Sequence, residues 1–311
     1  MKLVVSGALG HIGSGLIREI PKVFPQAEVL MLDNLATQRY GSLFDLPPEG
    51  HYSFIEGDVL TAPLEKLFQG ADAVIHLAAI TNAAASFKIR KEIEKVNYGG
   101  TKQVAKACVH AGCPLIFPSS TSVYGTQKEV VDENCPLLDL KPQSPYAETK
   151  LKEESFLHTL GESKGLRYVI CRFGTICGVS PGMRFHTAVN KFCWQAVMGE
   201  PLTVWQTALH QKRPYLSLRD GVHAIAHAIR SGLFDGKTYN VLTANMTVDS
   251  ILKIIGKYVP DSKIKYVDHE IMNLLSYEVA NARFQGTGFR YQGDLERDIR
   301  ETIQLLRGAR H

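Results

Sequence analysis

The sequence predicts an α/β protein built on a doubly wound parallel sheet, with a smaller lobe toward the C-terminus. Two observations support this fold class. Short apolar runs alternate with longer amphipathic stretches as far as residue 173, and the first apolar run leads directly into a glycine-rich turn. Strands and helices that alternate at this spacing imply parallel strands covered by helices on both faces.

The elements of this pattern can be placed in order along the chain. The apolar runs predict strands at residues 2–7, 28–33, 52–58, 72–79, 114–120 and 167–173. The amphipathic stretches between them predict helices at residues 10–20, 91–111 and 146–160.

The pattern changes after residue 173. Glycine and proline in residues 174–185 indicate a loop, and a further helix is expected from Asp220, where apolar residues repeat at helical spacing. We therefore expect a main body over residues 1–173, to which about 214–240 return. Residues 174–311 would then form most of the smaller lobe.

Composition and charge exclude several classes of protein. The net charge of +4, from 35 basic and 31 acidic residues, is small and dispersed, which disfavours nucleic-acid binding. No apolar run approaches the roughly 20 residues that span a bilayer, and an immediate strand start leaves no room for a signal peptide. The 6 cysteines form no CxxC pair and no cluster with histidine. We expect reduced thiols, no metal site and a cytoplasmic protein.

The first turn, "GALGHIG", indicates a dinucleotide site. Gly7, Gly10 and Gly13 recur every three residues between a strand and a helix, where the backbone can approach a pyrophosphate beside free N–H donors. Asp33 ends the second strand twenty residues later, where an acid can bind the ribose hydroxyls and repel a 2′-phosphate. This favours NAD over NADP. An ordinary tight turn is the alternative for the glycines alone.

Two further strand ends carry residues suited to the same ligand. Asp58 follows the third strand and could accept from the adenine amino group, although a plain loop carboxylate is nearly as good an explanation. Ala78 and Ala79 end the fourth strand and are small enough for the backbone to touch a cofactor. His76, beside them, is expected to be a core histidine.

The stretch "SPYAETK" places Tyr146 four residues before Lys150. On a helix these side chains share one face, one turn apart. A free phenol has a pKa of about 10, and a neighbouring cation favours its ionised form. The pair could therefore supply a general base near neutral pH, whereas an exposed helical pair is the alternative.

These motifs, with "LDNL", "GDV", "HLAA", "VNYGGT", "SSTSVYG" and "RFGTICG", occur in the order found in the extended short-chain dehydrogenase/reductase family. The chain resembles its NAD-dependent sugar-nucleotide epimerase/dehydratase branch, including enzymes similar to UDP-glucose 4-epimerase. The resemblance covers residues 1 to about 180 and continues more loosely to the end. It implies a Rossmann domain that binds NAD over residues 1–173 and a lobe that binds a nucleotide-diphosphate sugar.

The resemblance also implies roles for individual residues. Tyr146 would be the general base, Lys150 would lower its pKa and hold the nicotinamide ribose, and Ser120 would hydrogen-bond the reacting oxygen. The expected NAD-binding residues are Gly7, Gly10, His11, Ile12, Gly13, Asp33, Asn34, Asp58, Val59, Leu77, Ala78, Ala79, Asn97, Tyr146, Lys150 and Phe173. Within this set, Asn97 is expected to give structural support, and His11 is expected to take no part in the chemistry.

The expected substrate-binding residues include two that lie where the chain departs from the family. The full set is Thr81, Ser120, Thr121, Tyr146, Thr175, Arg184, Asn190 and Arg213. Thr175 replaces a common asparagine and Cys177 a common tyrosine, so no particular sugar can be carried over. Arg213 is expected to meet a phosphate, because a guanidinium binds phosphate oxygens in pairs.

The resemblance leaves several reactions open. Dehydratases of the family carry an acid–base pair directly after the catalytic serine or threonine, whereas this chain has Thr121 and Ser122. Such hydroxyls are poor groups for eliminating water. We therefore expect a 4-epimerase that acts through a 4-keto sugar, with a 4-dehydrogenase, 4-ketoreductase or dehydratase as the alternative. A dinucleotide-binding protein without activity is a further alternative, although the retained Tyr146 and Lys150 argue against it. The family usually forms homodimers through the helices expected at 91–111 and 146–160.

Overall fold

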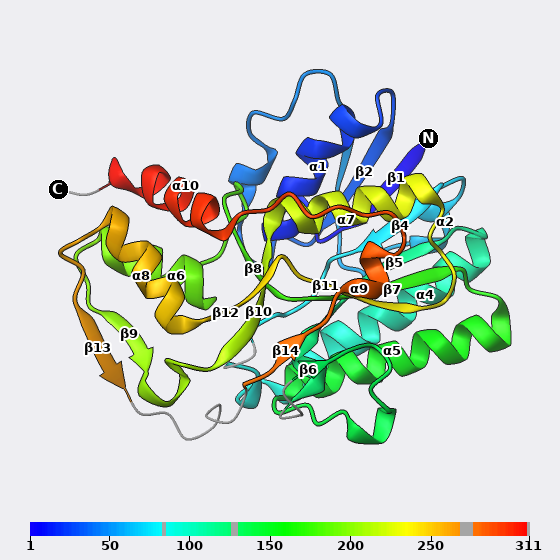
Figure 1. The fold of residues 1–311 in the computed structure, drawn as a ribbon. Helices are drawn as coiled ribbons and strands as arrows, with labels where there is room; N and C mark the ends of the chain where they lie inside the picture. The colour runs from blue at the N-terminus through cyan, green and yellow to red at the C-terminus, as the bar shows by residue number, and fades with distance from the viewer. Residues whose placement is uncertain (83–84, 126–129, 268–275, 310–311) are drawn as a thin grey trace.

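The computed structural model describes residues 1–82, 85–125, 130–267 and 276–309. Its main body is a seven-stranded sheet in which every paired strand is parallel, in the order β11-β7-β5-β4-β1-β2-β3 (Figure 1). The strands are β1 (Lys2–Ser6), β2 (Glu28–Asp33), β3 (His51–Glu56), β4 (Ala73–His76), β5 (Leu115–Ser120), β7 (Tyr168–Phe173) and β11 (Thr238–Val241). This is the predicted doubly wound sheet. The six predicted strands all occur in it, and β11 completes the edge beside β7.

Helices cover both faces of this sheet (Figure 1). One face carries α1 (His11–Val23) and α7 (Leu218–Ser231), which pack against each other. The other carries α2 (Leu64–Phe68), α4 (Gly99–Ala111) and α5 (Pro145–Lys164). The helix expected from Asp220 thus begins at Leu218.

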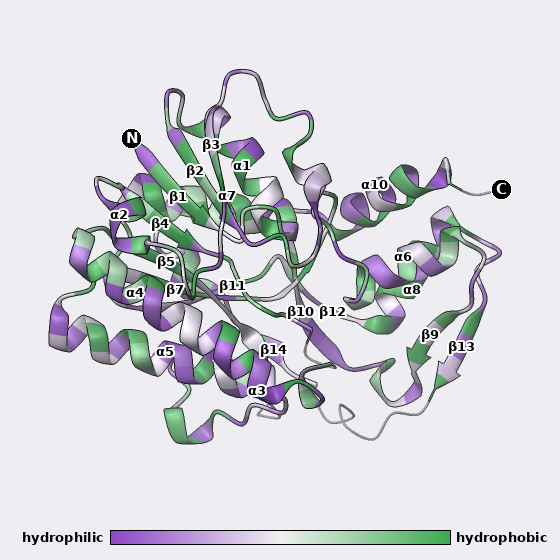
Figure 2. Ribbon diagram, turned by 180° about the vertical axis from the view of Figure 1, so that it is seen from behind, coloured by the Kyte–Doolittle hydropathy of each residue, from purple (hydrophilic) through white to green (hydrophobic). Residues whose placement is uncertain are grey.

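Alternate residues of β1 explain why the sheet is buried on both sides. Leu3 and Val5 join a core with Leu16 and Ile225 from the first helical layer, whereas Val4 joins the opposite core. Side chains of a strand alternate between its two faces, so a continuous apolar run is what a doubly covered strand requires. In Figure 2 the helices that cover the sheet alternate between green, hydrophobic and purple, hydrophilic segments, as expected of helices with one face against a sheet.

The smaller lobe has its own core. It contains α6 (Ala188–Val197), α8 (Val248–Tyr258), α10 (Leu295–Arg307) and the parallel pair β9 (Leu202–Trp205) and β13 (Ile264–Val267). Apolar residues from all three helices form this core, among them Phe192, Ile251 and Ile299. The lobe stands to the left of the sheet in Figure 1, with the C-terminus at its outer end.

Short sheets connect the lobe to the main body. β10 (Lys212–Ser217) lies between β8 (Thr175–Cys177) and β12 (Ala244–Thr247). β14 (Glu278–Val279) pairs with β6 (Val130–Val131), and α9 (Ala282–Gln285) packs against β11. Phe284 of α9 joins the core of the main body, so part of the chain after residue 276 returns there.

Two sequence expectations need correction. Residues 174–185 were expected to be a loop, but they include β8, because Thr175–Cys177 pair in parallel with β10. The single helix expected at 91–111 consists of α3 (Arg90–Ile93), a π-helical segment (Glu94–Tyr98) and α4. Single π-helical turns are rare and occur frequently at functional sites. Among the described residues, no helix is long and apolar enough to cross a membrane.

Candidate active site

The glycine turn lies where the strand order reverses. β1 pairs with β2 on one side and β4 on the other, so the carboxyl ends of these strands form the crevice where open α/β sheets bind ligands. Gly7 has φ +71°, and a Cβ there would lie 2.5 Å from the Ala78 backbone nitrogen. A Cβ at Gly13 would lie 2.4 Å from Gly7 O. Both positions therefore require glycine.

Helix α1 begins at this turn without a side-chain cap. Gly10 is its N-cap residue, and no side chain hydrogen-bonds to the first turn from that position. The N-terminus of α1, with His11, Ile12 and Gly13, therefore presents backbone N–H donors and the positive end of the helix dipole. A strand, a glycine-rich turn and an uncapped helix N-terminus together fit a pyrophosphate group.

Asp33 has a structural task beside its expected one. Its Oδ2 accepts from Leu9 N (3.0 Å) and its Oδ1 from Leu35 N (3.0 Å), so the carboxylate ties β2 to the glycine turn. A carboxylate has about four lone-pair positions. Asp33 can therefore hold these two amides and still accept from ribose hydroxyls.

The loop after β3 is hydrogen-bonded to the loop after β2. Asn34 Nδ2 donates to Asp58 Oδ2 (2.9 Å), and Asp58 Oδ1 accepts from Leu60 N (2.8 Å). Val59, between these residues, is buried. The loops after β2 and β3 thus form one hydrogen-bonded wall beside the turn.

Arg39 is a cation at this wall that sequence reasoning missed. It is partly buried, and its Nη1 lies 3.8 Å from where a Cβ of Gly10 would be. Burial lowers the pKa of Arg39, and the negative charge of Asp33 counteracts this effect. A guanidinium at the phosphate end of the crevice suits an anionic ligand. The signal in the sequence was a lone basic residue in the loop after Asp33, which has no local pattern.

Asn97 supports the loop after β4. The asparagine is fully buried in the π-helical segment, accepting from Ile80 N (2.8 Å) and donating to Ile80 O (2.9 Å). Both ends of its amide are thus used to hold the backbone that carries Leu77, Ala78 and Ala79. This geometry is that of the structural support expected for Asn97.

The three expected catalytic residues come from β5 and α5. Ser120 ends β5, and its Oγ accepts from Ser122 N (3.2 Å) and from Ser122 Oγ (2.8 Å). Tyr146 and Lys150 lie one turn apart in α5, whose N-cap Ser144 accepts from Ala147 N (3.2 Å). α5 packs against the short 3-10 helix that follows Ser120. The structure therefore places α5, which carries Tyr146 and Lys150, next to the end of β5, which carries Ser120.

Lys150 is almost completely buried, with 3% of its surface exposed. Its ammonium lies 3.2 Å from Glu153 Oε2 and 4.4 Å from the centre of the Phe117 ring. His76, which shares a hydrogen bond with Ser6 (2.7 Å), is also buried. Burial, and then the charge of Lys150, lower the pKa of His76 to about 3, so it is neutral near pH 7. This environment matches the core histidine expected from the sequence.

The loop after β8 lies directly against the glycine turn. His11 Nε2 donates to Gly178 O (2.7 Å), Ser180 Oγ donates to His11 O (2.8 Å), and Gly182 N donates to Ser14 Oγ (2.9 Å). A Cβ at Gly182 would lie 2.1 Å from Leu9 O. These contacts join segments about 170 residues apart, and they were not predicted. Burial is the main reason that the pKa of His11 falls to about 3.

Three of the expected substrate residues, Thr81, Arg184 and Asn190, are connected by hydrogen bonds. Arg184 Nη1 donates to the hydroxyl of Thr81, which links the lobe to the loop after β4. Asn190 is fully buried, and its amide donates to Arg184 O (3.0 Å) and accepts from Gly178 N (3.4 Å). The geometry makes Asn190 a support for the loop that carries Arg184.

Three further expected residues lie in or next to β5, β8 and β10. Thr121 is buried and donates to Phe173 O (3.3 Å) at the end of β7. Thr175 begins β8 and pairs with Tyr215 of β10. Arg213 lies in β10, two residues before Tyr215. Arg213 Nη2 donates to Gln211 Oε1 (3.2 Å). Cys177 is fully buried among the core of the smaller lobe.

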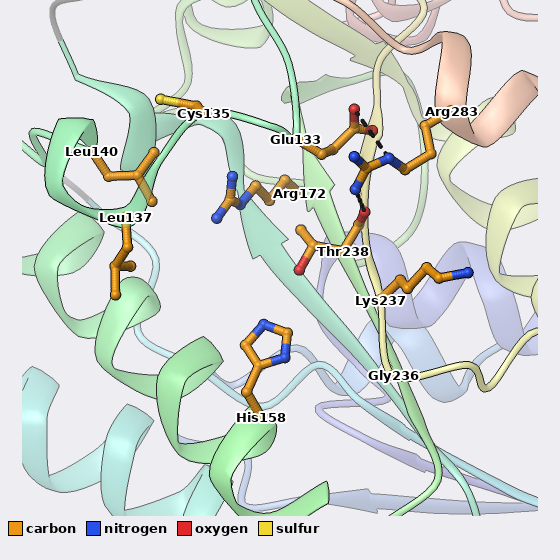
Figure 3. A pocket seen from close by; sticks show the side chains of 10 residues that line it. All are labelled: Glu133, Cys135, Leu137, Leu140, His158, Arg172, Gly236, Lys237, Thr238 and Arg283. Carbon is orange, nitrogen blue, oxygen red and sulfur yellow. Dashed lines mark hydrogen bonds and ion pairs between the residues drawn. The ribbon is translucent and has the colours of Figure 1, made fainter. Parts of the chain in front are cut away.

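A separate pocket of about 300 Å³ lies away from these residues (Figure 3). Its lining includes Glu133, His158, Arg172 and Arg283, and none of the residues expected to bind cofactor or substrate. Arg283 forms an ion pair with Glu133 (3.9 Å), drawn in Figure 3, and Arg172 pairs with Glu154 (2.7 Å). These guanidinium groups are already matched by carboxylates, so the pocket shows no charge that requires a ligand.

Comparisons with known proteins identify a matching family model and several similar proteins. A model of the "NAD dependent epimerase/dehydratase family" matches residues 3–241. An uncharacterized UDP-glucose epimerase, YtcB, of Bacillus subtilis is 32% identical over 265 residues, which cover 82% of this chain and 80% of that protein. A trifunctional enzyme of Arabidopsis thaliana, whose activities include UDP-glucose 4,6-dehydratase, is 27% identical over 97% of this chain. The match spans only 46% of that longer protein.

A solved structure gives the same picture. The UDP-glucose 4-epimerase of Thermus thermophilus, in complex with NAD, superposes with a TM-score of 0.85 at 25% identity. The match covers 99% of this chain and 100% of that chain. The similarity therefore extends over both the sheet and the smaller lobe.

Proposed function

This chain belongs to the NAD-dependent epimerase/dehydratase family, and we propose that it is a nucleotide-diphosphate-sugar 4-epimerase that acts through a 4-keto sugar. The family membership expected from the sequence motifs is confirmed. The observation that carries the choice of reaction is the chemistry of the two residues after Ser120. Thr121 donates to a backbone carbonyl and Ser122 donates to Ser120, so neither offers the acid–base pair that dehydration needs.

NAD fits the residues present at the glycine turn. The cradle at Gly7 and Gly13 has no room for a side chain, the N-terminus of α1 is uncapped, and Asp33 retains acceptor capacity for ribose hydroxyls. NAD supplies a group that accepts hydride from the sugar and returns it. We propose that Asp33, Asn34 and Asp58 hold the adenosine, while the first turn of α1 and Arg39 hold the pyrophosphate.

The chain's own residues perform the proton chemistry. In our proposal Tyr146 removes the proton of the sugar 4-hydroxyl and later returns it. Ser120 hydrogen-bonds the same oxygen, and Lys150 holds a positive charge beside the phenol. Because Ser122 donates to Ser120 Oγ, the serine hydroxyl proton can point away from Ser122 and toward the substrate. Return of hydride to the opposite face needs no further catalytic group.

We propose that Thr81, Thr121, Thr175, Arg184 and Arg213 face the sugar nucleotide. Asn190 acts on it indirectly, by holding Arg184. The support is the contact between Arg184 and Thr81, and the similarity of the chain to UDP-glucose epimerases.

The test is a panel of UDP-, GDP-, CDP- and dTDP-sugars, with products followed by mass spectrometry and proton NMR. An epimerase conserves the substrate mass and changes the coupling of the C4 proton. A product lighter by two hydrogens would instead identify a 4-dehydrogenase, and loss of water would identify a dehydratase. The absence of turnover with NAD bound would support a binding protein without activity.

We also propose that the protein is a homodimer in the cytoplasm. α3 and the π-helical segment lie beside α5 on the outside of the sheet. Arg90 of α3 pairs with Glu148 (2.7 Å), Glu94 of the π-helical segment pairs with Lys152, and the rings of Tyr98 and Phe156 are 6.0 Å apart. Such a paired helical face could meet its copy across a two-fold axis. A monomer in light scattering at micromolar concentration would contradict the dimer. The six cysteines, all within the described residues, form no disulfide bond, which is compatible with a reducing compartment.

A further inference from the structure

Lys150 has an internal counter-ion that the expected mechanism does not use. Glu153 lies one turn further along α5, and its Oε2 is 3.2 Å from the lysine ammonium. The side chains of Lys150 and Glu153 are only 4% and 1% exposed, respectively. A buried charge is unfavourable unless an opposite charge lies beside it. Glu153 therefore matters for Lys150 in a way that an exposed partner would not.

Groups from every neighbouring element define the surroundings of the pair. Thr101 of α4 donates to Glu153 Oε1 (2.6 Å), and the Phe117 ring of β5 lies under the ammonium. His76 of β4 is neutral, as described above. Glu154, the next residue of α5, is matched by Arg172 of β7 through contacts of 2.7, 3.0 and 3.2 Å. Glu153 is therefore the carboxylate that balances Lys150.

The contact is close, yet it leaves the lysine donors available. Glu153 Oε2 is not aligned as the acceptor of a hydrogen bond, although it is within ion-pair distance of the ammonium. A lysine ammonium has three N–H donors. Glu153 thus fixes the position of the charge. Even with one N–H directed at Glu153, two donors of the ammonium remain that can bind a ribose or the Tyr146 oxygen.

We propose that Glu153 is a positioning residue that anchors the Lys150 ammonium and moderates its effect on the Tyr146 phenol. This inference rests on the proposed function in one respect, because the kinetic test needs turnover of a sugar nucleotide. Tyr146 and Glu153 are seven residues apart in one helix, which corresponds to a rise of about 10 Å. A buried negative charge at that distance disfavours a second negative charge on the phenol oxygen. Arg184, in the loop after β8, also interacts electrostatically with Tyr146, and it is present in every variant compared below.

The test begins with Glu153→Gln, which removes the charge and keeps the size of the side chain. The acidic limb of the pH profile of kcat/KM should move to lower pH by about half a unit to one unit, because the phenolate no longer faces a carboxylate. Thr101→Val is a gentler second variant. It removes the donor that stabilises the ionised Glu153, whose pKa burial already raises. It should move the limb in the same direction by less.

Glu148→Gln is the matched control on the same helix. Glu148 is closer to Tyr146 in sequence, but it is exposed and pairs with Arg90 at the surface. Water and salt screen such a charge, so this variant should move the limb by about 0.2 units or less. The comparison separates burial from mere proximity.

A second readout does not depend on the substrate. The near-ultraviolet absorbance of tyrosinate, taken as the difference between each protein and the same protein with Tyr146→Phe, should follow the same order of shifts. If Glu153→Gln and Thr101→Val lower the melting temperature but leave both the kinetic limb and this absorbance unchanged, Glu153 is only structural and the proposal is wrong. If the absorbance shifts without turnover of any sugar nucleotide, Glu153 acts as proposed and the proposed function is wrong.

Discussion

Removing the charge of Glu154 should destabilise this protein strongly. Glu154 and Arg172 have side chains only 3% and 7% exposed, joined by a bidentate contact between α5 and β7. Ser119 donates a further hydrogen bond to Glu154, and the guanidinium of Arg172 lies 4.9 Å from the centre of the Tyr124 ring. In Glu154→Gln the guanidinium would stay buried without a counter-ion.

The expected magnitude follows from this burial. Breaking a buried ion pair by removing one partner costs about 3–5 kcal/mol. Unfolding entropies average about 2.1 cal/mol/K per residue, which gives about 0.65 kcal/mol/K for 311 residues. The melting temperature of Glu154→Gln should therefore fall by about 5–8 °C.

Calorimetry and urea unfolding measure this loss directly. Glu148→Gln again serves as the control, because its pair with Arg90 is exposed and worth about 0–1 kcal/mol. Replacing both partners, as in Glu154→Leu with Arg172→Met, should recover much of the stability, since apolar side chains of similar volume avoid the cost of burying charge. A loss below about 1 kcal/mol for Glu154→Gln, or no recovery in the double variant, would refute this reasoning.

Three further predictions concern the cofactor site, the general base and the smaller lobe. Tyr146→Phe should lower kcat by at least about 100-fold in the turnover assay with a sugar nucleotide, because the proton-transfer group is lost. Asp33→Ala should weaken NAD binding by about 10- to 150-fold, which corresponds to one hydrogen bond to a charged group. A preference for NADP in the unmodified protein would contradict the role of Asp33. Burial raises the pKa of Asp298 from 3.8 to about 6, so the folded state holds this proton more tightly and its stabilising effect is lost as pH rises from about 4 to 6. In urea unfolding, Asp298→Asn should lack this decline, which amounts to about 3 kcal/mol at most; parallel curves for both proteins would rule the assignment out.

Much of the architecture was determined by the sequence itself, because local backbone chemistry controls it. Continuous apolar runs predict strands that are buried on both faces, and all six predicted strands lie in the parallel sheet. The glycines of the first turn mark positions where a Cβ would collide with the backbone, so the turn could be recognised without a structure. The spacing of Tyr146 and Lys150 likewise follows from the helical repeat alone.

Only the tertiary structure decided which polar groups meet. Asp33 ties down the glycine turn, Asn190 holds the loop of Arg184, and the loop after β8 is joined to α1 across about 170 residues. The pairing of Glu153 with Lys150 is local in sequence, but their burial depends on α4 and β5, which come from elsewhere in the chain. A sequence pattern in one segment predicts the backbone conformation of that segment only. The strength of an ion pair depends on how much water the rest of the fold excludes, and no segment encodes that alone.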